Sequence, residues 1–191
     1  MRWFGALAAL LTCPSAWACE LSLVTPATSA LKNSVQVRIS LSDDALLARF
    51  AIASPSIDAK KVLAAGEYPY LFDVVELFVT SSDSGFPYFE FEVSPYNQTF
   101  QVRIVGAREH HEGVDLGLAS TAEIARGGWT AEMKIPLKLL GWNGDPAKIR
   151  GNLYSVLGEG KRRSYWSAFL PKAVKANFHQ PRYFRPLSQC S

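Results

Sequence analysis

Short segments in which apolar and polar residues alternate dominate the chain, and this period of two constrains the fold most strongly. In residues 34–41 (SVQVRISL), every second residue from Val35 to Leu41 is apolar. Residues 88–93 (YFEFEV) alternate without a break. Because successive side chains of a strand point to opposite faces, each segment predicts a strand with one buried face.

Further strand-like segments follow one another between turns rich in Gly, Pro, Asn, Asp and Ser. They are residues 45–54, 72–81, 99–106, 127–136, 150–160 and 163–171. Many short strands predict an all-β fold, which we expect to be a two-sheet antiparallel β-sandwich of jelly-roll or immunoglobulin-like architecture. Helical signals are few: residues 135–142 and 120–127 each suggest one turn, and residues 54–66 suggest a short helix or a loop.

The first 18 residues differ in character from the rest of the chain. Arg2 places a positive charge at the N-terminus, and residues 4–11 are nearly all apolar. Ala16 and Ala18 supply the small residues of a cleavage site. This pattern predicts a signal peptide over residues 1–18 and one mature domain over residues 19–191, with a buried N-terminal helix as the alternative. The apolar run is shorter than the roughly 20 residues that span a bilayer. We therefore expect a periplasmic or secreted protein without a transmembrane segment.

Cleavage after Ala18 would leave one cysteine near each end of the mature chain, Cys19 and Cys190. An even count in an oxidising compartment favours a disulfide between them. Closing so long a loop would stabilise the fold by about 4–5 kcal/mol through loop-closure entropy. The alternative is a lipoprotein acylated at Cys19, although Trp17 is bulky for the processing site that this requires.

The charge pattern excludes several classes of protein. The net charge is +3, and the dense basic run is confined to residues 161–163. This is too little for a nucleic-acid-binding face. The sequence also lacks a glycine-rich phosphate loop, a GxSxG nucleophile motif and an HExxH zinc motif.

Three glutamates stand on predicted strands. Glu90 and Glu92 share one face of residues 88–93, where two carboxylates could form a glycosidase pair. A solvent-exposed sheet face is the favoured interpretation of these two. Glu76 lies in the apolar segment FDVVELFV, so its carboxylate needs a partner, which is a cation, a hydroxyl or a ligand. Arg103 is one candidate partner.

The histidines and the tryptophan near the C-terminus have competing interpretations. His110 and His111 are neighbours, and neighbours on an extended chain point in opposite directions, so they predict a solvated loop rather than a metal site. His179 in FHQP predicts a hydrogen bond that holds a turn. Trp166 follows a basic turn, and its ring is either core or a platform on which a sugar stacks. From the residues alone, core packing is favoured.

Four blocks in this order resemble carbohydrate-binding module family 9 and its relatives in the DOMON-like β-sandwich superfamily. The blocks are residues 72–79 (FDVVELFV), 87–98 (PYFEFEVSPYNQ), 127–142 (GGWTAEMKIPLKLLGW) and 150–187. They match the family's "vElf" strand, its "yyeFevsP" strand, its "gW.aE..IP...L" segment and its aromatic closing stretch. The resemblance covers roughly residues 35–187 and implies a β-sandwich of two antiparallel sheets.

The resemblance also implies a function. Members of the family hold a sugar between two aromatic rings, with polar residues on its hydroxyls, and catalyse nothing themselves. By match to the blocks, the carbohydrate-binding candidates are the rings of Tyr70 and Trp166 and the polar side chains of Glu76 and Asn152. We add Arg103 from its place on a strand. The expected partner is an oligo- or polysaccharide, and a secreted glycoside hydrolase or an envelope protein is a further one.

Two other functions stay open. Related DOMON-like domains bind haem through Met together with His or Lys, and Met133 is the methionine that remains after leader removal. The second alternative is an envelope structural or partner-binding sandwich that has lost its sugar site. The resemblance allows calcium, although no Asp-rich loop of the EF-hand type is present.

Overall fold

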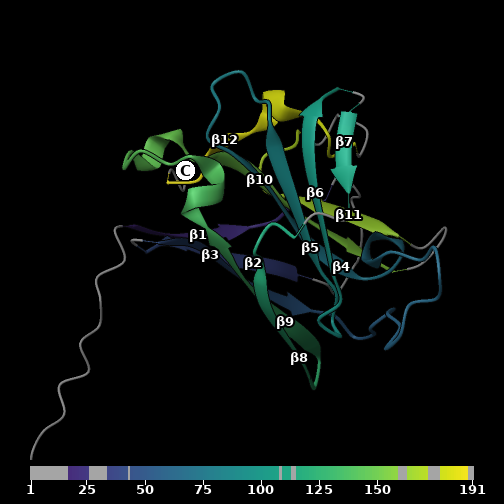
Figure 1. The fold of residues 1–191 in the computed structure, drawn as a ribbon. Helices are drawn as coiled ribbons and strands as arrows, with labels where there is room; N and C mark the ends of the chain where they lie inside the picture. The colour runs from purple at the N-terminus through teal and green to yellow at the C-terminus, as the bar shows by residue number, and fades with distance from the viewer. Residues whose placement is uncertain are drawn as a thin grey trace, which may run out of the picture.

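The alternating segments pair into two antiparallel sheets that face each other (Figure 1). The structure is a computed structural model, and it describes residues 17–25, 34–42, 44–107, 109–112, 115–158, 163–171 and 177–188. Apart from short 3-10 turns, the described elements are strands. The predicted fold class, an all-β sandwich of two antiparallel sheets, is confirmed.

The first sheet, here called sheet A, has five strands in the order β1-β2-β3-β9-β8. Its strands are β1 (Trp17–Ser22), β2 (Ser34–Leu41), β3 (Ala45–Ala53), β8 (Ala119–Ala125) and β9 (Gly128–Pro136). Exposed and buried residues alternate along β2, as its sequence predicts. Sheet A therefore has one face toward the core and one toward water.

The second sheet, sheet B, has seven strands, six of them in the order β11-β10-β4-β5-β6-β7, while β12 also pairs with β10. Its strands are β4 (Val74–Thr80), β5 (Tyr88–Val93), β6 (Thr99–Gly106), β7 (Glu109–Glu112), β10 (Arg150–Leu157), β11 (Ser164–Ser167) and β12 (Arg185–Pro186). All residues of β4 and β5 are buried. These two strands are therefore covered on both faces, unlike those of sheet A.

Two apolar clusters account for this difference. The main core fills the space between the sheets and includes Trp129 and Met133 from sheet A and Leu77 and Phe91 from sheet B. A second cluster lies on the outer face of sheet B, the face turned away from sheet A, and includes Phe78, Tyr88, Tyr154 and Phe184. We call residues 177–188 the cover segment, because Phe184 from this segment packs on that face.

The helical predictions have mixed outcomes. The turn predicted within residues 135–142 is present as η2 (Leu137–Leu140), which ends at Gly141 in the left-handed conformation. The other 3-10 turns are η1 (Pro69–Leu71), η3 (Pro146–Lys148) and η5 (Pro181–Tyr183). The turn predicted within residues 120–127 is wrong, since this segment forms β8, whose backbone pairs with β9. Residues 54–66 adopt the loop alternative.

The predicted leader and disulfide fall largely outside the described residues. Strand β1 begins at Trp17 and pairs with β2, and nothing described precedes it. Cys19 is buried, whereas Cys190 lies beyond the described residues, so their pairing stays a prediction. Within the described part of the chain, no helix has the length and apolar character needed to cross a bilayer.

Candidate functional site

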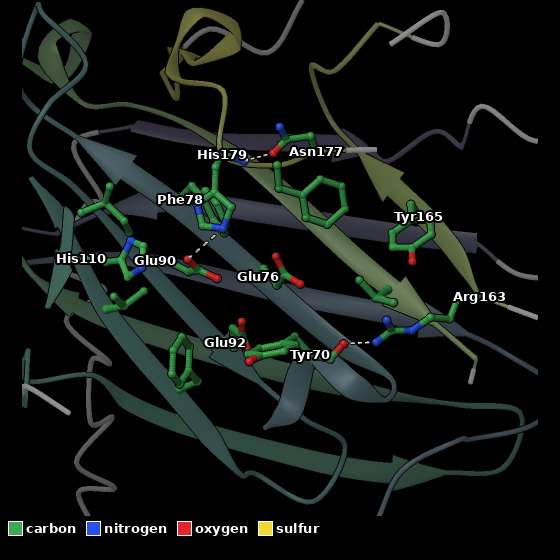
Figure 2. Close-up of a pocket in the computed structure, with 15 residues that line it drawn as sticks. Tyr70, Glu76, Phe78, Glu90, Glu92, His110, Arg163, Tyr165, Asn177 and His179 are labelled. Atoms are coloured by element: carbon green, nitrogen blue, oxygen red, sulfur yellow. Dashed lines mark hydrogen bonds and ion pairs between the residues drawn. The ribbon is translucent and has the colours of Figure 1, made fainter. Parts of the chain in front are cut away.

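The outer face of sheet B is hollowed beside the cover segment into a pocket of about 410 Å³ (Figure 2). Strands β4, β5 and β6 supply its floor, and β7, β10, β11 and the cover segment contribute to its walls. This volume lies in the range typical of small-molecule sites. Because side chains alternate along β4 and β5, every second one points to the outer face. Of these, Glu76, Phe78, Glu90 and Glu92 line the pocket.

Three glutamates meet on the pocket floor, and we call Glu76, Glu90 and Glu92 the glutamate cluster. Glu76 lies on β4 directly opposite Glu92 on β5, and Phe78 lies opposite Glu90. One carboxylate oxygen from each glutamate lies within 4.8 Å of the other two. The three residues are only 3%, 5% and 0% exposed, respectively.

The predicted solvent-exposed face for Glu90 and Glu92 is therefore wrong. The alternation of β5 is as the sequence predicts, but its polar face is the floor of a pocket rather than open surface. The burial comes from distant segments, namely the cover segment and the loop before β4, which no local pattern places on this strand. The register of the β4–β5 hairpin was the available signal, since it pairs Glu76 with Glu92.

Burial dominates the electrostatics of the cluster. The pKa of Glu76 is raised well above its ordinary value by desolvation and then by the neighbouring Glu90, while Arg163 acts in the opposite direction. Desolvation also raises the pKa of Glu92, and repulsion from Glu76 and Glu90 adds to this. The Glu90 carboxyl and the Tyr70 backbone lie near enough to act on the pKa of Glu92 as well, but neither carboxylate oxygen of Glu92 makes a hydrogen bond of normal geometry with a described residue. Burial therefore favours the protonated, neutral form of Glu76 and Glu92.

The cation that acts on Glu76 is Arg163, and the predicted partner Arg103 lies elsewhere. Arg103 points to the other side of β6, where it lines a different hollow together with Phe89 and Leu140. Arg163 precedes β11 at the pocket wall, and its guanidinium donates a hydrogen bond to the backbone carbonyl of Tyr70. Its buried Nε has no hydrogen-bond partner among the described residues.

Aromatic rings form much of the pocket wall. Tyr70 lines the pocket and is 37% exposed, and its ring stacks on Tyr68 with centroids 5.2 Å apart. Tyr165 on β11 lines the wall together with Phe178, and their rings meet edge to face at 6.0 Å. Rings of this kind offer flat apolar faces with negative charge density to a ligand.

Trp166 lies on the opposite side of β11 from this wall. It is 7% exposed and belongs to the main core between the sheets, and its Nε1 donates a hydrogen bond to Ser164 Oγ at 3.1 Å. Trp166 therefore lies in the core, the position that the residues alone favoured, and its ring does not reach the pocket. The pocket-facing aromatic residue of β11 is its neighbour Tyr165, because adjacent strand residues point to opposite faces.

Asn152 is fully buried on β10 and does not line the pocket. Its Oδ1 accepts hydrogen bonds from Ser167 Oγ at 3.2 Å and from the Phe169 backbone N–H at 3.1 Å. The side chain thus fixes the chain that leaves β11 against β10. Of the five predicted carbohydrate-binding residues, the structure brings Tyr70 and Glu76 together and places Arg103, Asn152 and Trp166 outside the pocket.

Two histidines complete the far side of the pocket. His110 lies on β7 rather than in the predicted loop, and it lines the pocket opposite Arg163 (Figure 2). His179 from the cover segment makes a hydrogen bond with Tyr88 Oη at 2.9 Å, and its Nε2 lies 3.9 Å from Glu90. Burial lowers the pKa of His179, and the nearby His110 adds to this. Only the tertiary fold brings these histidines to the glutamates.

Met133, the candidate haem ligand, does not line this pocket. Met133 is fully buried in the main core on the inner face of sheet A. It pairs across the sheet with Ala48 of β3. The side chain therefore packs between the sheets and does not reach the pocket.

Comparison with known proteins supports the fold. No family model matches the sequence, and no curated protein matches it. A "putative carbohydrate-binding protein" from Bacteroides uniformis has a TM-score of 0.69 at 19% identity, over 88% of this chain and 84% of that chain. A carbohydrate-binding module family 9 domain from Caldicellulosiruptor kristjanssonii in complex with cellotriose has a TM-score of 0.58 at 13% identity, over 89% and 80%. Its glucose complex has a TM-score of 0.57 at 14% identity, over 87% and 80%. The fold implied by the four sequence blocks is thus confirmed.

Proposed function

We propose that this protein is a non-catalytic saccharide-binding module and that the pocket on sheet B holds the sugar. The observation that carries the proposal is the combination of buried carboxyl groups on the floor with aromatic rings on the walls. Sugars need both kinds of contact, because their ring faces carry C–H groups and their rims carry hydroxyls. The sugar complexes of the structurally similar family 9 module support this assignment.

The roles of the residues follow from their chemistry. Tyr70 and Tyr165 supply ring faces for stacking. Glu76 accepts hydrogen bonds from hydroxyls when ionised and can donate one when protonated, whereas the unpartnered Arg163 Nε can only donate. In this proposal Tyr165 replaces Trp166 as the second stacking ring.

The three carboxyl groups raise a second candidate function, glycoside hydrolysis. Retaining glycosidases place two carboxyl groups about 5–5.5 Å apart, and the cluster has oxygens within 4.8 Å of one another. However, these enzymes need their two groups on either side of the scissile bond. Here all three glutamates rise from the adjacent strands β4 and β5, so they approach a ligand from one side. The arrangement favours binding over cleavage.

We further propose that the protein is secreted or periplasmic, with Cys19 and Cys190 paired in a disulfide and, as the alternative, Cys19 acylated. These proposals rest on the leader-like N-terminus and on the cysteine count of the sequence. A secreted glycoside hydrolase or an envelope protein is the partner that such a module would serve. Mass spectrometry of the purified protein tests cleavage, acylation and disulfide formation together.

A glycan array tests the function directly. We expect the wild type to bind saccharides, and we expect Tyr70→Ala and Tyr165→Ala to lower affinity by about tenfold or more, as loss of an aromatic contact does. Tyr96→Ala is the matched control, because Tyr96 is equally exposed but lies outside the pocket. Incubation with any bound oligosaccharide should release no new reducing ends. If the folded wild type binds no glycan, the partner-binding alternative replaces the proposal.

A further inference from the structure

The pocket carries more acid than base. Three glutamates line it, whereas Arg163 is the one permanently charged cation among its described lining residues. Arg163 also donates to the backbone carbonyl of Tyr70 at the wall, so part of its hydrogen-bonding capacity is used there. A ligand that carries a positive charge would balance the excess of carboxyl groups.

Glu92 provides an independent sign that this part of the pocket suits a hydrogen-bond donor from a ligand. It is 0% exposed, it faces the pocket, and neither of its carboxylate oxygens has a hydrogen-bond partner among the described residues. Buried polar groups are almost always hydrogen-bonded, because an unpaired one loses its contacts with water without replacement. A donor on the ligand would supply this partner.

The geometry of the cluster indicates which chemical group on a ligand would be the hydrogen-bond donor. Figure 2 shows the carboxyl groups of Glu76, Glu90 and Glu92 gathered in the middle of the pocket, and their oxygens lie within 4.8 Å of one another. A hydroxyl group has one hydrogen to donate and can satisfy only one of them. A primary ammonium group has three donors and a positive charge, so it can serve all three carboxylates at once.

The rest of the lining favours an organic cation over a metal ion. Calcium takes six to eight oxygen ligands, and magnesium keeps an octahedral shell that includes several waters. The remaining lining residues are mostly aromatic or aliphatic, including Phe100, Val102 and Val156, and they offer few further oxygen ligands to complete the shell of a metal ion. A sugar that carries an amine combines an ammonium group with apolar ring faces, and aromatic walls suit both.

We propose that the pocket selects saccharides that carry a free primary amine, the hexosamine class, and that the glutamate cluster holds the ammonium group. This inference rests on the proposed saccharide-binding function and names its ligand class. The ammonium lies over β4 and β5 between Glu76, Glu90 and Glu92. The sugar ring lies against Tyr70 and Tyr165.

Binding should also release protons. Burial raises the pKa of Glu76 and of Glu92, whereas a bound ammonium group would stabilise the ionised carboxylates and lower these pKa values. The other titratable or charged groups that line the pocket are Arg163, His110, His179, Tyr70 and Tyr165, with Tyr88 and Tyr154 beside it. Calorimetry in two buffers of different ionisation enthalpy measures the number of protons released, which a neutral ligand would leave close to zero.

Three trisaccharides with the same β-1,4-linked backbone make a matched test. They are cellotriose, its 2-amino analogue (the glucosamine trimer) and the N-acetylated form of that amine. At about pH 6, where a primary amine is protonated, we expect calorimetry to show the amine bound at least about tenfold more tightly than the other two. Glu92→Gln should abolish this preference. Glu123→Gln, at an exposed glutamate of β8 on sheet A, should retain it.

The other outcomes overturn the proposal in distinguishable ways. If cellotriose or the acetylated trimer binds as tightly as the amine, the pocket is a saccharide site without amine selectivity. If none of the three binds to the folded wild type, the proposed function fails together with this inference. If calcium chloride raises the melting temperature of the wild type but not of Glu92→Gln, the cluster holds a metal ion and the amine assignment is wrong.

Discussion

The outer faces of the two sheets carry charged residues under opposite conditions. On sheet A, Arg49 pairs with Glu132 across β3 and β9, and Arg38 pairs with Glu20 across β1 and β2. The side chains of both pairs are well exposed. On sheet B, the glutamate cluster is almost fully buried, and the Arg163 guanidinium partly offsets the effect of burial on the pKa of Glu76.

This contrast separates charges that keep a sheet face in water from charges that perform a function. An exposed ion pair contributes about 0–1 kcal/mol, because water and salt screen it and two long side chains must be ordered. A buried carboxyl without a partner is destabilising, so it persists only where a ligand or a specific fold requires it. The same residue type, glutamate, thus has a minor role on sheet A and the leading role on sheet B.

The largest expected effect tests whether the outer face of sheet B is a second core. Phe184 in the cover segment is almost completely buried and packs edge to face on Tyr88, with ring centroids 5.4 Å apart. We expect Phe184→Ala to lower the free energy of unfolding by about 3–5 kcal/mol, the usual cost of removing a buried ring. Urea denaturation measures this.

The control for that variant lies on sheet A. Ile124 on β8 is 41% exposed, and Ile124→Ala should change the free energy of unfolding by less than about 0.5–1 kcal/mol. Equal losses in the two variants would show that the cover segment contributes no more than surface packing. The distinction between the two outer faces would then lose its basis.

The next effect compares one glutamate from each sheet. Glu92→Gln keeps the shape of the side chain, removes the buried acid and adds an N–H donor beside Glu76 and Glu90. We expect it to raise the free energy of unfolding at neutral pH by about 1–3 kcal/mol, the size of the penalty for an unsatisfied buried group. Glu132→Gln should lower it by less than about 1 kcal/mol, since it only weakens an exposed pair.

The two substitutions should change the free energy of unfolding in opposite directions, so one experiment distinguishes the two glutamates. Thermal or urea unfolding of the two variants beside the wild type is sufficient. Destabilisation by Glu92→Gln would contradict the interpretation, because it would mean that the folded protein depends on the ionised carboxylate. A gain in stability together with a loss of amine binding would identify Glu92 as a residue kept for function.

Much of the fold could be predicted from the sequence, because the period of two is a local property. The alternation in β2, β5 and β9 identifies strands without knowledge of their partners. The edge strands β7 and β8 escaped prediction, since their residues are mostly exposed and carry no clean alternation. What makes them strands is backbone pairing with β6 and β9.

The site was less predictable, because burial of a strand face depends on segments far away in the chain. The pattern around Glu76 indicated a buried acid correctly. The same reasoning failed for Glu90 and Glu92. The alternation of polar and apolar residues along β5 is equally compatible with a solvent-exposed face and with a pocket floor. Which of two adjacent rings, Tyr165 or Trp166, faces the pocket depends on which side of β11 meets sheet A, and no local pattern reports this.

The last prediction concerns pH and has the smallest expected effect. Glu76 and Glu92 have pKa values in the folded protein above their ordinary value of 4.5. Above about pH 4.5 the unfolded chain therefore loses protons that the folded chain still holds. The stability that these groups contribute is fully present at lower pH and is lost as the pH rises toward their folded pKa values. His179 acts in the opposite sense, because burial lowers its pKa and folding opposes its protonation as the pH falls below 6.5.

The difference between wild type and Glu92→Gln cancels the contribution of His179 and leaves that of Glu92 together with its repulsion of Glu76 and Glu90. We expect the stability advantage of Glu92→Gln to grow by on the order of 1 kcal/mol between about pH 5 and pH 7, as measured by urea denaturation at each pH. A constant difference for Glu92→Gln would mean that the Glu92 carboxyl has the same protonation in the folded and unfolded chains, and burial on the floor of sheet B would then not control its ionisation.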